Sequence, residues 1–175
     1  DHPQFKTYAE ELKWLTTDKV RMAWVAKTIK DISTSGNTLI LVDRISAGEI
    51  LQEQIEDAVF VSGSTKNVDR KEQYDEVSTA TNKIIIATYG VASVGINIPR
   101  IFNLVLIEPG KSFVRVIQSI GRGIRKAEDK ENVQIWDITS SCKFAKRHLG
   151  ARKKFYKEAN YPYTIEKINY ENPYT

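Results

Sequence analysis

The strongest constraint on the fold is a series of short apolar runs that alternate with helix-like segments. Residues 38–42, Thr-Leu-Ile-Leu-Val, form a continuous apolar run, which is typical of a strand buried on both faces of a sheet. Strands that alternate with helices predict a mostly parallel α/β sheet with helices on both faces, whose functional groups lie on loops at the carboxyl ends of the strands. Further strands are predicted at 58–61, 83–87, 103–107 and 132–138, and helices at 8–32, 46–55, 68–78 and 112–121.

The length of 175 residues corresponds to one domain. We divide residues 1–175 into a helical lead-in at 1–36, a core at 37–140, and a basic helix with a terminal strand at 141–175. The terminal strand is predicted at 163–168, where apolar and polar residues alternate as in an edge strand. The chain opens with Asp-His-Pro and has neither an initiator Met nor a signal-peptide pattern, and we therefore expect it to be a piece of a longer protein.

Cysteine content and hydropathy exclude several classes of protein. Cys142 is the single cysteine, so the chain has no intramolecular disulfide framework and no cysteine-based zinc site, and we expect no metal site of its own. A single free thiol fits a reducing cytosol, which predicts a cytoplasmic protein. No apolar run approaches the roughly 18 residues of a membrane span, so we expect no membrane partner.

Positive charge is concentrated in residues 143–157. The whole chain has a net charge of +4, but the remainder of the chain, outside this stretch, is net negative. A helix with this pattern is either a face that contacts phosphate groups or a solvated surface. The stretch contains no acidic residue, and its basic residues are Lys143, Lys146, Arg147, Arg152, Lys153, Lys154 and Lys157.

Residues 110–112, Gly-Lys-Ser, follow a predicted strand and open a predicted helix, as a P-loop would. A P-loop needs another glycine five positions earlier, where this chain has Val105, and Glu108-Pro109 replaces the flexible phosphate cradle. The acidic pair Asp75-Glu76 lies in a polar predicted helix, whereas a magnesium-binding pair is expected at the end of an apolar strand. The sequence therefore shows no means of holding magnesium nucleotide by itself.

Residues 118–125 carry two arginines and an amide at helical spacing. Gln118, Arg122 and Arg125 occupy positions i, i+4 and i+7, so a helix would project all three side chains from one face. Arginine suits phosphate binding because its planar group is always charged and donates two parallel hydrogen bonds. The alternative is an ordinary basic helix, on which two arginines three residues apart are common.

A loop rich in glycine and small hydroxyl residues follows the strand predicted at 83–87. It contains Thr88, Tyr89, Gly95 and Asn97. Hydroxyl groups and backbone amides at the end of a strand can donate hydrogen bonds to nucleic-acid phosphates. Alternatively, the glycines only allow a tight crossover loop.

Together these two segments resemble motifs V and VI of the superfamily 2 helicases. Thr88 and residues 95–99, Gly-Ile-Asn-Ile-Pro, match the pattern Thr followed by Gly-x-Asp/Asn-x-Pro. Residues 118–125 match Gln/His-x-x-Gly-Arg-x-x-Arg. Residues 38–44 resemble the motif IV strand, and residues 61–65, with an arginine after them, resemble the element of strand, glycine loop and arginine that follows it.

Within the superfamily, residues 8–32 and the end of the chain resemble phage recombination-repair helicases of the UvsW type, with the XPB and RecG groups as looser relatives. The resemblance implies a RecA-like fold and the second motor domain of an ATP-dependent DNA helicase or translocase, acting in recombination or repair by branch migration or unwinding. ATP and Mg²⁺ would be held mainly by the N-terminal RecA-like domain of the same protein, so this chain alone would be inactive. A phage-encoded protein of this type would lie in the host-cell cytoplasm.

The resemblance also implies roles for individual residues. Arg125 and Arg122 would be catalytic arginine fingers that reach the γ-phosphate, and Gln118 would contact the same phosphate or position the attacking water. Gly95 and Asn97, together with the two arginines, would bind the nucleotide. Many family members have Asp where this chain has Asn97, so a carboxylate that braces the arginines is missing at this position.

Nucleic-acid contacts are expected at the loops after the first strands and on the basic helix. Branched or forked DNA is the expected partner, with RNA as an alternative, and such backbone contacts fix position without reading sequence. The residues are Arg44, Gly63, Ser64, Thr88, Tyr89, Lys153 and Lys154. Two other functions stay open on the sequence: a non-enzymatic basic nucleic-acid-binding module with a RecA-like fold, and a small self-sufficient NTPase that uses residues 110–112.

Overall fold

The structure is a computed structural model that describes residues 2–63, 71–72, 76–77, 82–93, 98–110, 113–125 and 133–172, with the backbone alone at 99 and 120–125. Its helices are α1 (Tyr8–Thr17), α2 (Lys19–Ser33), α3 (Ile45–Gln54), α5 (Tyr89–Ser93), α6 (Phe113–Gly123) and α7 (Lys143–Glu158). Its strands are β1 (Thr38–Val42), β2 (Val59–Val61), β3 (Ile84–Thr88), β4 (Ile98–Pro99), β5 (Asn103–Ile107), β6 (Ile124–Arg125) and β7 (Gln134–Ile138). In this described part of the chain, we find no helix with the length and apolar character needed to span a membrane.

The main sheet has five parallel strands in the order β2-β3-β1-β5-β7. The central strand β1 pairs on both sides, with Thr38 opposite Ile84 of β3 and opposite Asn103 of β5. From β1 the chain passes to β2 at one edge of the sheet, returns to β3 between β2 and β1, and then adds β5 and β7 on the other side of β1. This confirms the predicted parallel α/β architecture.

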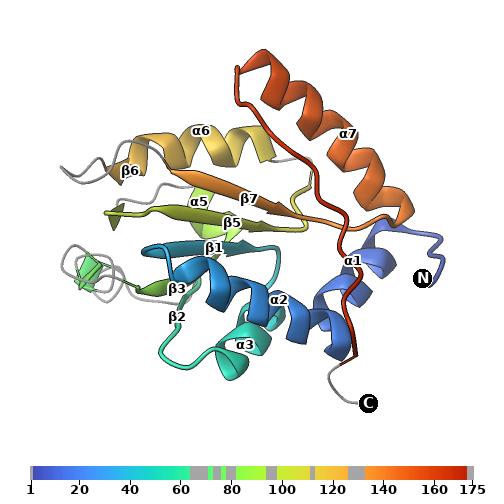
Figure 1. The fold of residues 1–175 in the computed structure, drawn as a ribbon, viewed down its shortest axis with the longest axis horizontal. Helices are drawn as coiled ribbons and strands as arrows, with labels where there is room; N and C mark the ends of the chain where they lie inside the picture. Colours follow the sequence, from blue (N-terminus) through green and yellow to red (C-terminus); the bar gives the residue numbers. More distant parts are fainter. Residues whose placement is uncertain are drawn as a thin grey trace.

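Helices cover both faces of the sheet because alternate residues of each buried strand point to opposite sides (Figure 1). On one face, Leu39 and Leu41 pack with apolar side chains of α5, α6 and α7. On the other face, Ile40 and Val42 pack with those of α2 and α3. All five residues of β1 are buried, as the apolar run predicts.

The lead-in predicted as helical at 8–32 consists of two helices, and the break lies at Asp18. Thr7 caps α1, its hydroxyl accepting a hydrogen bond from the Glu10 amide at 3.2 Å. Asp18 caps α2, its carboxylate accepting from the Arg21 amide at 3.0 Å. The other strand and helix predictions agree with the structure to within about two residues at each end, except for the helix at 68–78, most of which lies outside the described residues.

The terminal strand predicted at 163–168 is wrong. Residues 161–172 form neither a strand nor a helix, and the segment runs from the end of α7 across to α2 (Figure 1). The Tyr163 ring contacts Tyr156 of α7 at 5.7 Å, and the Tyr170 ring stacks on Trp24 of α2 at 5.1 Å between centroids. Because these two anchors lie on helices of opposite layers, the segment crosses the edge of the sheet and does not run beside β7.

Candidate functional site

Three residues predicted to contact nucleic acid lie at the carboxyl ends of three neighbouring strands. Arg44 follows β1, Gly63 follows β2, and Thr88 ends β3. The register places Val42 opposite Thr88 and Val61 opposite Ala87, so the three loops leave the sheet side by side. The Arg44 side chain is 36% exposed and forms a 3.5 Å ion pair with Asp43.

Gly63 is exposed, and a Cβ there would meet no atom of the described residues within 4 Å. Ser64, which the sequence places in the same loop, lies outside the described residues. The combination of a partly exposed arginine with an exposed glycine is suited to contact with a phosphate backbone.

Thr88 and Tyr89 both have partners inside the fold. The Thr88 hydroxyl accepts a hydrogen bond from the Val91 amide at 3.2 Å and so caps the short helix α5. The Tyr89 hydroxyl donates to the carbonyl of Ile107 at 2.9 Å, which ties the start of α5 to the end of β5. The Tyr89 ring is partly buried and packs against the core, so the described contacts of this side chain lie inside the fold, and its contact with nucleic acid stays a prediction.

The structure brings the two motif-like segments together. Strand β4 pairs with β6 in parallel, with Ile98 opposite Ile124 and Pro99 opposite Arg125. The Ser119 hydroxyl of α6 donates to the carbonyl of Ser93 of α5 at 3.2 Å. The strand pairing and this hydrogen bond therefore join two segments that lie about 25 residues apart in the sequence. Gly95 and Asn97 lie outside the described residues.

The expectation that Gln118, Arg122 and Arg125 share one helical face is wrong for Arg125. Helix α6 ends at Gly123, and Arg125 belongs to β6. Pairing with β4 replaces the helical hydrogen bonds at this point. Gln118 is exposed on α6, and Arg122 lies in the last turn of the same helix.

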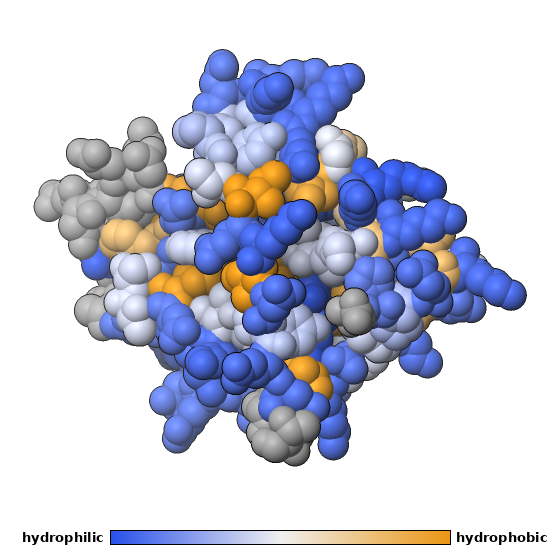
Figure 2. Space-filling view, turned by 45° about the vertical axis from the view of Figure 1, so that its right-hand side comes forward, coloured by the Kyte–Doolittle hydropathy of each residue, from blue (hydrophilic) through white to orange (hydrophobic). Residues whose placement is uncertain are grey.

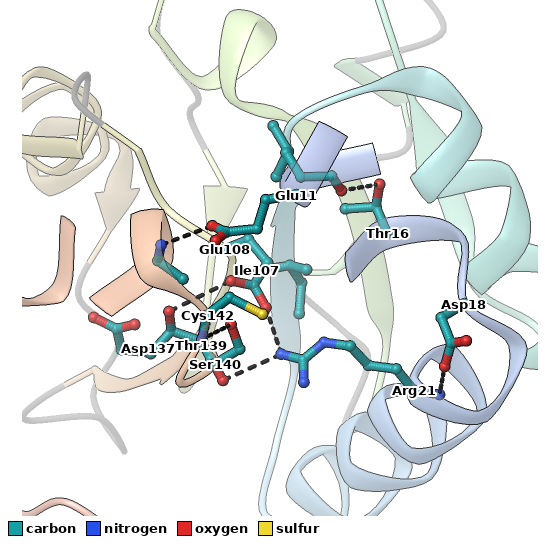
Figure 3. A network of polar contacts seen from close by, with 12 residues as sticks. Glu11, Thr16, Asp18, Arg21, Ile107, Glu108, Asp137, Thr139, Ser140 and Cys142 are labelled. Atoms are coloured by element: carbon teal, nitrogen blue, oxygen red, sulfur yellow. Dashed lines mark hydrogen bonds and ion pairs between the residues drawn. The ribbon is translucent and has the colours of Figure 1, made fainter. Parts of the chain in front are cut away.

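The loop that leads from β5 into α6 is held by a buried ion pair (Figure 3). Glu108 has a positive φ of 45°, which is costly for a residue with a side chain. Its carboxylate pairs with Arg21 of α2, and Arg21 also donates to the carbonyl of Thr139 at 3.1 Å. Burial raises the pKa of Glu108, and the neighbouring guanidinium of Arg21 offsets this rise only in part.

A second buried arginine holds the same loop from the opposite layer. Arg152 of α7 is 2% exposed and donates to both carboxylate oxygens of Asp137, at 2.7 and 2.9 Å. It also donates to the carbonyl of Pro109 at 2.9 Å, and the Tyr156 hydroxyl donates to Asp137 at 2.8 Å. Arg152 therefore belongs to the interior and is not part of the exposed basic face.

The sequence analysis missed this polar network, although two signals point to it. Asp137 is a charged residue inside a predicted apolar strand, and Glu108 directly follows a buried strand. A charge in such a position requires a buried partner of opposite sign. The pairing with Arg21 and Arg152 joins segments that are distant in the sequence, so the partners themselves are visible only in the fold.

Helix α1 closes this region from the amino-terminal side. The buried carboxylate of Glu11 accepts hydrogen bonds from the amides of Phe144 and Ala145, at 2.9 and 2.8 Å, and so caps α7. The Tyr8 hydroxyl lies so close to Gly110 that a Cβ on this glycine would be 2.8 Å away. Lys111 and Ser112 lie outside the described residues, but residues 108–110 are packed against protein groups and do not form an open phosphate cradle.

The basic helix forms as predicted, and all of its positive charges except that of Arg152 face away from the sheet. Ala145, Arg152 and Tyr156 form the buried side of α7. Lys154 is exposed and Lys153 is half-exposed. The outward-facing cations include these two residues, which are predicted to contact nucleic acid. The full set is Lys143, Lys146, Arg147, Lys153, Lys154 and Lys157.

The buried tyrosines predict a loss of stability at alkaline pH. Burial raises the pKa of Tyr156, and the Asp137 carboxylate raises that pKa further. A tyrosine in the unfolded chain loses its proton near pH 10. The contribution of protonated Tyr156 to the free energy of unfolding is therefore complete below about pH 10 and is lost as the pH rises above it. We expect Tyr156→Phe to reduce the fall in unfolding free energy above pH 10 by up to about 1.4 kcal/mol per pH unit. Urea unfolding between pH 9 and 11.5 measures this, with Tyr161→Phe, 44% exposed, as control; equal slopes in both variants would contradict it.

A parallel sheet of this order, with residues 88–93 and 98–99 against 113–125, has the RecA-like fold of helicase C-terminal domains. The chain belongs to the helicase conserved C-terminal domain family, whose model matches residues 20–127. It is 30% identical over 180 residues to the ATP-dependent DNA helicase UvsW of Enterobacteria phage T4, covering 94% of this chain and 36% of that helicase. The chain thus spans about a third of the length of that relative.

Solved structures agree with this assignment. The crystal structure of T4 UvsW matches with a TM-score of 0.73 and 25% identity, over 87% of this chain and 35% of that one. The C-terminal domain of the DEAD-box protein Dbp5 shares the fold, with a TM-score of 0.58 and 19% identity over 89% of this chain and 83% of that one. The RecA-like helicase fold and the relationship to UvsW expected from the motifs are confirmed.

Proposed function

We propose that this chain is the second motor domain of an ATP-dependent DNA helicase or translocase. The observation that carries the proposal is the β4–β6 pairing, which places the backbone of Arg125 beside Pro99 and so joins the two helicase-like segments. In this arrangement Arg125 and Arg122 act as arginine fingers for a nucleotide held mainly by an N-terminal RecA-like domain. Gln118 contacts the same phosphate or positions the attacking water, and Gly95 and Asn97 contribute to the nucleotide site.

The residues of this chain fit a shared nucleotide better than one bound by the chain alone. Residues 108–110 are engaged by Tyr8, Arg21 and Arg152, which leaves no cradle for phosphates there. ATP with Mg²⁺ supplies the phosphate bond whose hydrolysis provides energy. This chain adds positive charge where negative charge develops on the transferring phosphoryl group, which is the main source of acceleration in such chemistry.

Movement along nucleic acid follows if both domains hold the backbone. Nucleotide that bridges two domains closes the cleft between them, and the loss of its terminal phosphate allows the cleft to open. On this chain, Arg44, Gly63, Ser64, Thr88 and Tyr89 provide the contact at the strand ends. Lys153 and Lys154 of α7 add contacts to phosphate. The relationship to a phage DNA helicase favours DNA as the partner, with branched structures as substrates in recombination and repair.

We expect the isolated chain to show no appreciable ATP hydrolysis. The physical reason is that residues 108–110 offer no phosphate cradle, so nucleotide and metal must be held elsewhere. Phosphate release is measured for the chain alone and for the full-length protein, each with and without forked DNA. The proposal is supported if forked DNA stimulates hydrolysis by the full-length protein while the isolated chain shows no hydrolysis with or without DNA.

Two outcomes would contradict the proposed function. Hydrolysis by the isolated chain that is lost in Lys111→Ala would establish residues 110–112 as a nucleotide site and favour the small NTPase. DNA binding by a full-length protein that does not hydrolyse ATP would favour the non-enzymatic module.

A further inference from the structure

The outer face of α7 is a stripe of positive charge. Its cations form two groups, Lys143, Lys146 and Arg147 in the first turns and Lys153, Lys154 and Lys157 in the last, and helical spacing places both groups on one side, opposite the buried Ala145 and Arg152. The stripe is about 21 Å long, at 1.5 Å per residue. All of α7 is described, and its single acidic residue is Glu158, at the last position. Hydrophilic side chains cover the upper part of the space-filling view, at the height of α7 in Figure 1 (Figure 2).

Gly150 lies in the middle of this stripe and has no packing role within the fold. It is exposed, it occupies the interior of a 16-residue helix, and a Cβ there would meet no atom within 4 Å. Glycine destabilises a helix interior relative to alanine, so this position carries a cost that no internal contact explains. A missing side chain flanked by cations leaves room for a phosphate backbone to approach the helix closely.

The aromatic rings of α7 are engaged by other side chains of the protein. The Phe144 ring contacts Tyr8 at 6.3 Å and is covered by the cations of Lys143 and Arg147, at 5.5 and 5.6 Å from its centroid. The Phe155 ring contacts Phe113 at 5.4 Å. Proteins that bind single strands combine positive charge with aromatic rings on which bases stack. A stripe of cations without such rings instead suits a duplex, whose stacked bases are closed off and which carries one charge per about 1.7 Å of its axis.

We infer that the outer face of α7 binds the phosphate backbone of double-stranded nucleic acid, with Gly150 at the point of closest approach. This surface lies on α7, whereas the loops of Arg44, Gly63 and Thr88 follow β1, β2 and β3. Through the outer face of α7 the helicase would bind a duplex arm of its substrate in addition to the strand along which it moves. The inference rests on the proposed function in taking nucleic acid as the partner.

The test compares binding of a blunt 30-base-pair duplex and a 30-nucleotide single strand to the full-length protein without ATP, from 50 to 300 mM salt. We expect Lys153→Gln/Lys154→Gln to lower the slope of log affinity against log salt by about two units on the duplex. The slope on the single strand should be unchanged. Lys27→Gln/Lys30→Gln, which removes two exposed cations of α2, is the matched control and should bind both as the wild type does.

Gly150→Ala provides a second, uncharged variant. It should not lower the melting temperature, because the Cβ meets open space, and it should weaken duplex binding at least several-fold by blocking close approach. Unchanged duplex binding in either α7 variant, or an equal loss on the single strand, would overturn the inference. ATP hydrolysis by the wild type is measured in the same preparation. If the wild type does not hydrolyse ATP but the α7 variants weaken duplex binding as expected, the proposed function fails and the inference stands. If the wild type hydrolyses ATP but the α7 variants bind the duplex normally, the proposed function stands and the inference fails.

Discussion

Arg125→Ala in the full-length protein is expected to lower the rate of ATP hydrolysis by about 10³–10⁵-fold, the range that an arginine finger contributes in phosphoryl transfer. The expected loss is in kcat, because the charge acts mainly on the transition state. Affinity for DNA should stay near that of the wild type, since Arg125 lies in β6 and the nucleic-acid loops follow β1, β2 and β3. Steady-state hydrolysis with saturating DNA, together with equilibrium DNA binding, measures both quantities.

Arg115→Ala is the matched control for this prediction. Arg115 lies on α6, in the same segment, and its side chain is exposed. The two variants remove the same charge from one part of the fold, so general electrostatic effects would lower both rates alike. Near-normal turnover in Arg125→Ala would show that this charge does not meet the nucleotide.

The second large effect is expected on stability, at the buried pair of Asp137 and Arg152. Asp137→Ala leaves the guanidinium of Arg152, 2% exposed, without its carboxylate partner. Breaking a buried ion pair from one side costs about 3–5 kcal/mol, because a charge is left in the interior without compensation. Urea unfolding at pH 7 measures this loss. Asp137→Ala/Arg152→Met should regain much of it, since no charge then stays buried.

Asp43→Ala is the control, because it also removes an aspartate that pairs with an arginine. The Asp43 side chain is 41% exposed and lies 3.5 Å from Arg44, so its loss should cost less than about 1 kcal/mol. Equal costs for the two aspartates would show that the Asp137 pair is not protected from solvent. A double variant as unstable as Asp137→Ala would show that the cost comes from lost packing.

The parts of the fold that could be predicted from the sequence are those set by local patterns. The apolar run of β1 depends on residues close together in the chain, and this strand was correctly placed. Arg125 was wrongly placed on the helical face, because the helical spacing of Arg122 and Arg125 continues past the point where pairing with β4 replaces the helix. Likewise, the charge of Arg152 resembles that of its basic neighbours, and only its partner Asp137 shows that it faces inward.

For the candidate site too, local patterns predicted one part, and contacts between distant segments determine the other. Motif spacing identified the residues, but their approach to one another depends on contacts between distant segments, such as the Ser119 hydroxyl with the Ser93 carbonyl. The tail was mispredicted for a related reason. Its alternating pattern suits a strand, but the stacking of Tyr170 on Trp24 fixes a path across the layers that no local pattern encodes.

The central position of β1 has a consequence for synthesis on the ribosome. β1 is completed early, yet its two neighbours are β3 and β5, so neither edge is paired until residues 84–88 and 103–107 have emerged. Until then the growing polypeptide presents an apolar segment with two open edges, the kind of segment that aggregates or engages chaperones. Truncation before Asn103 would leave one of these edges open permanently, because β5 would then never be made.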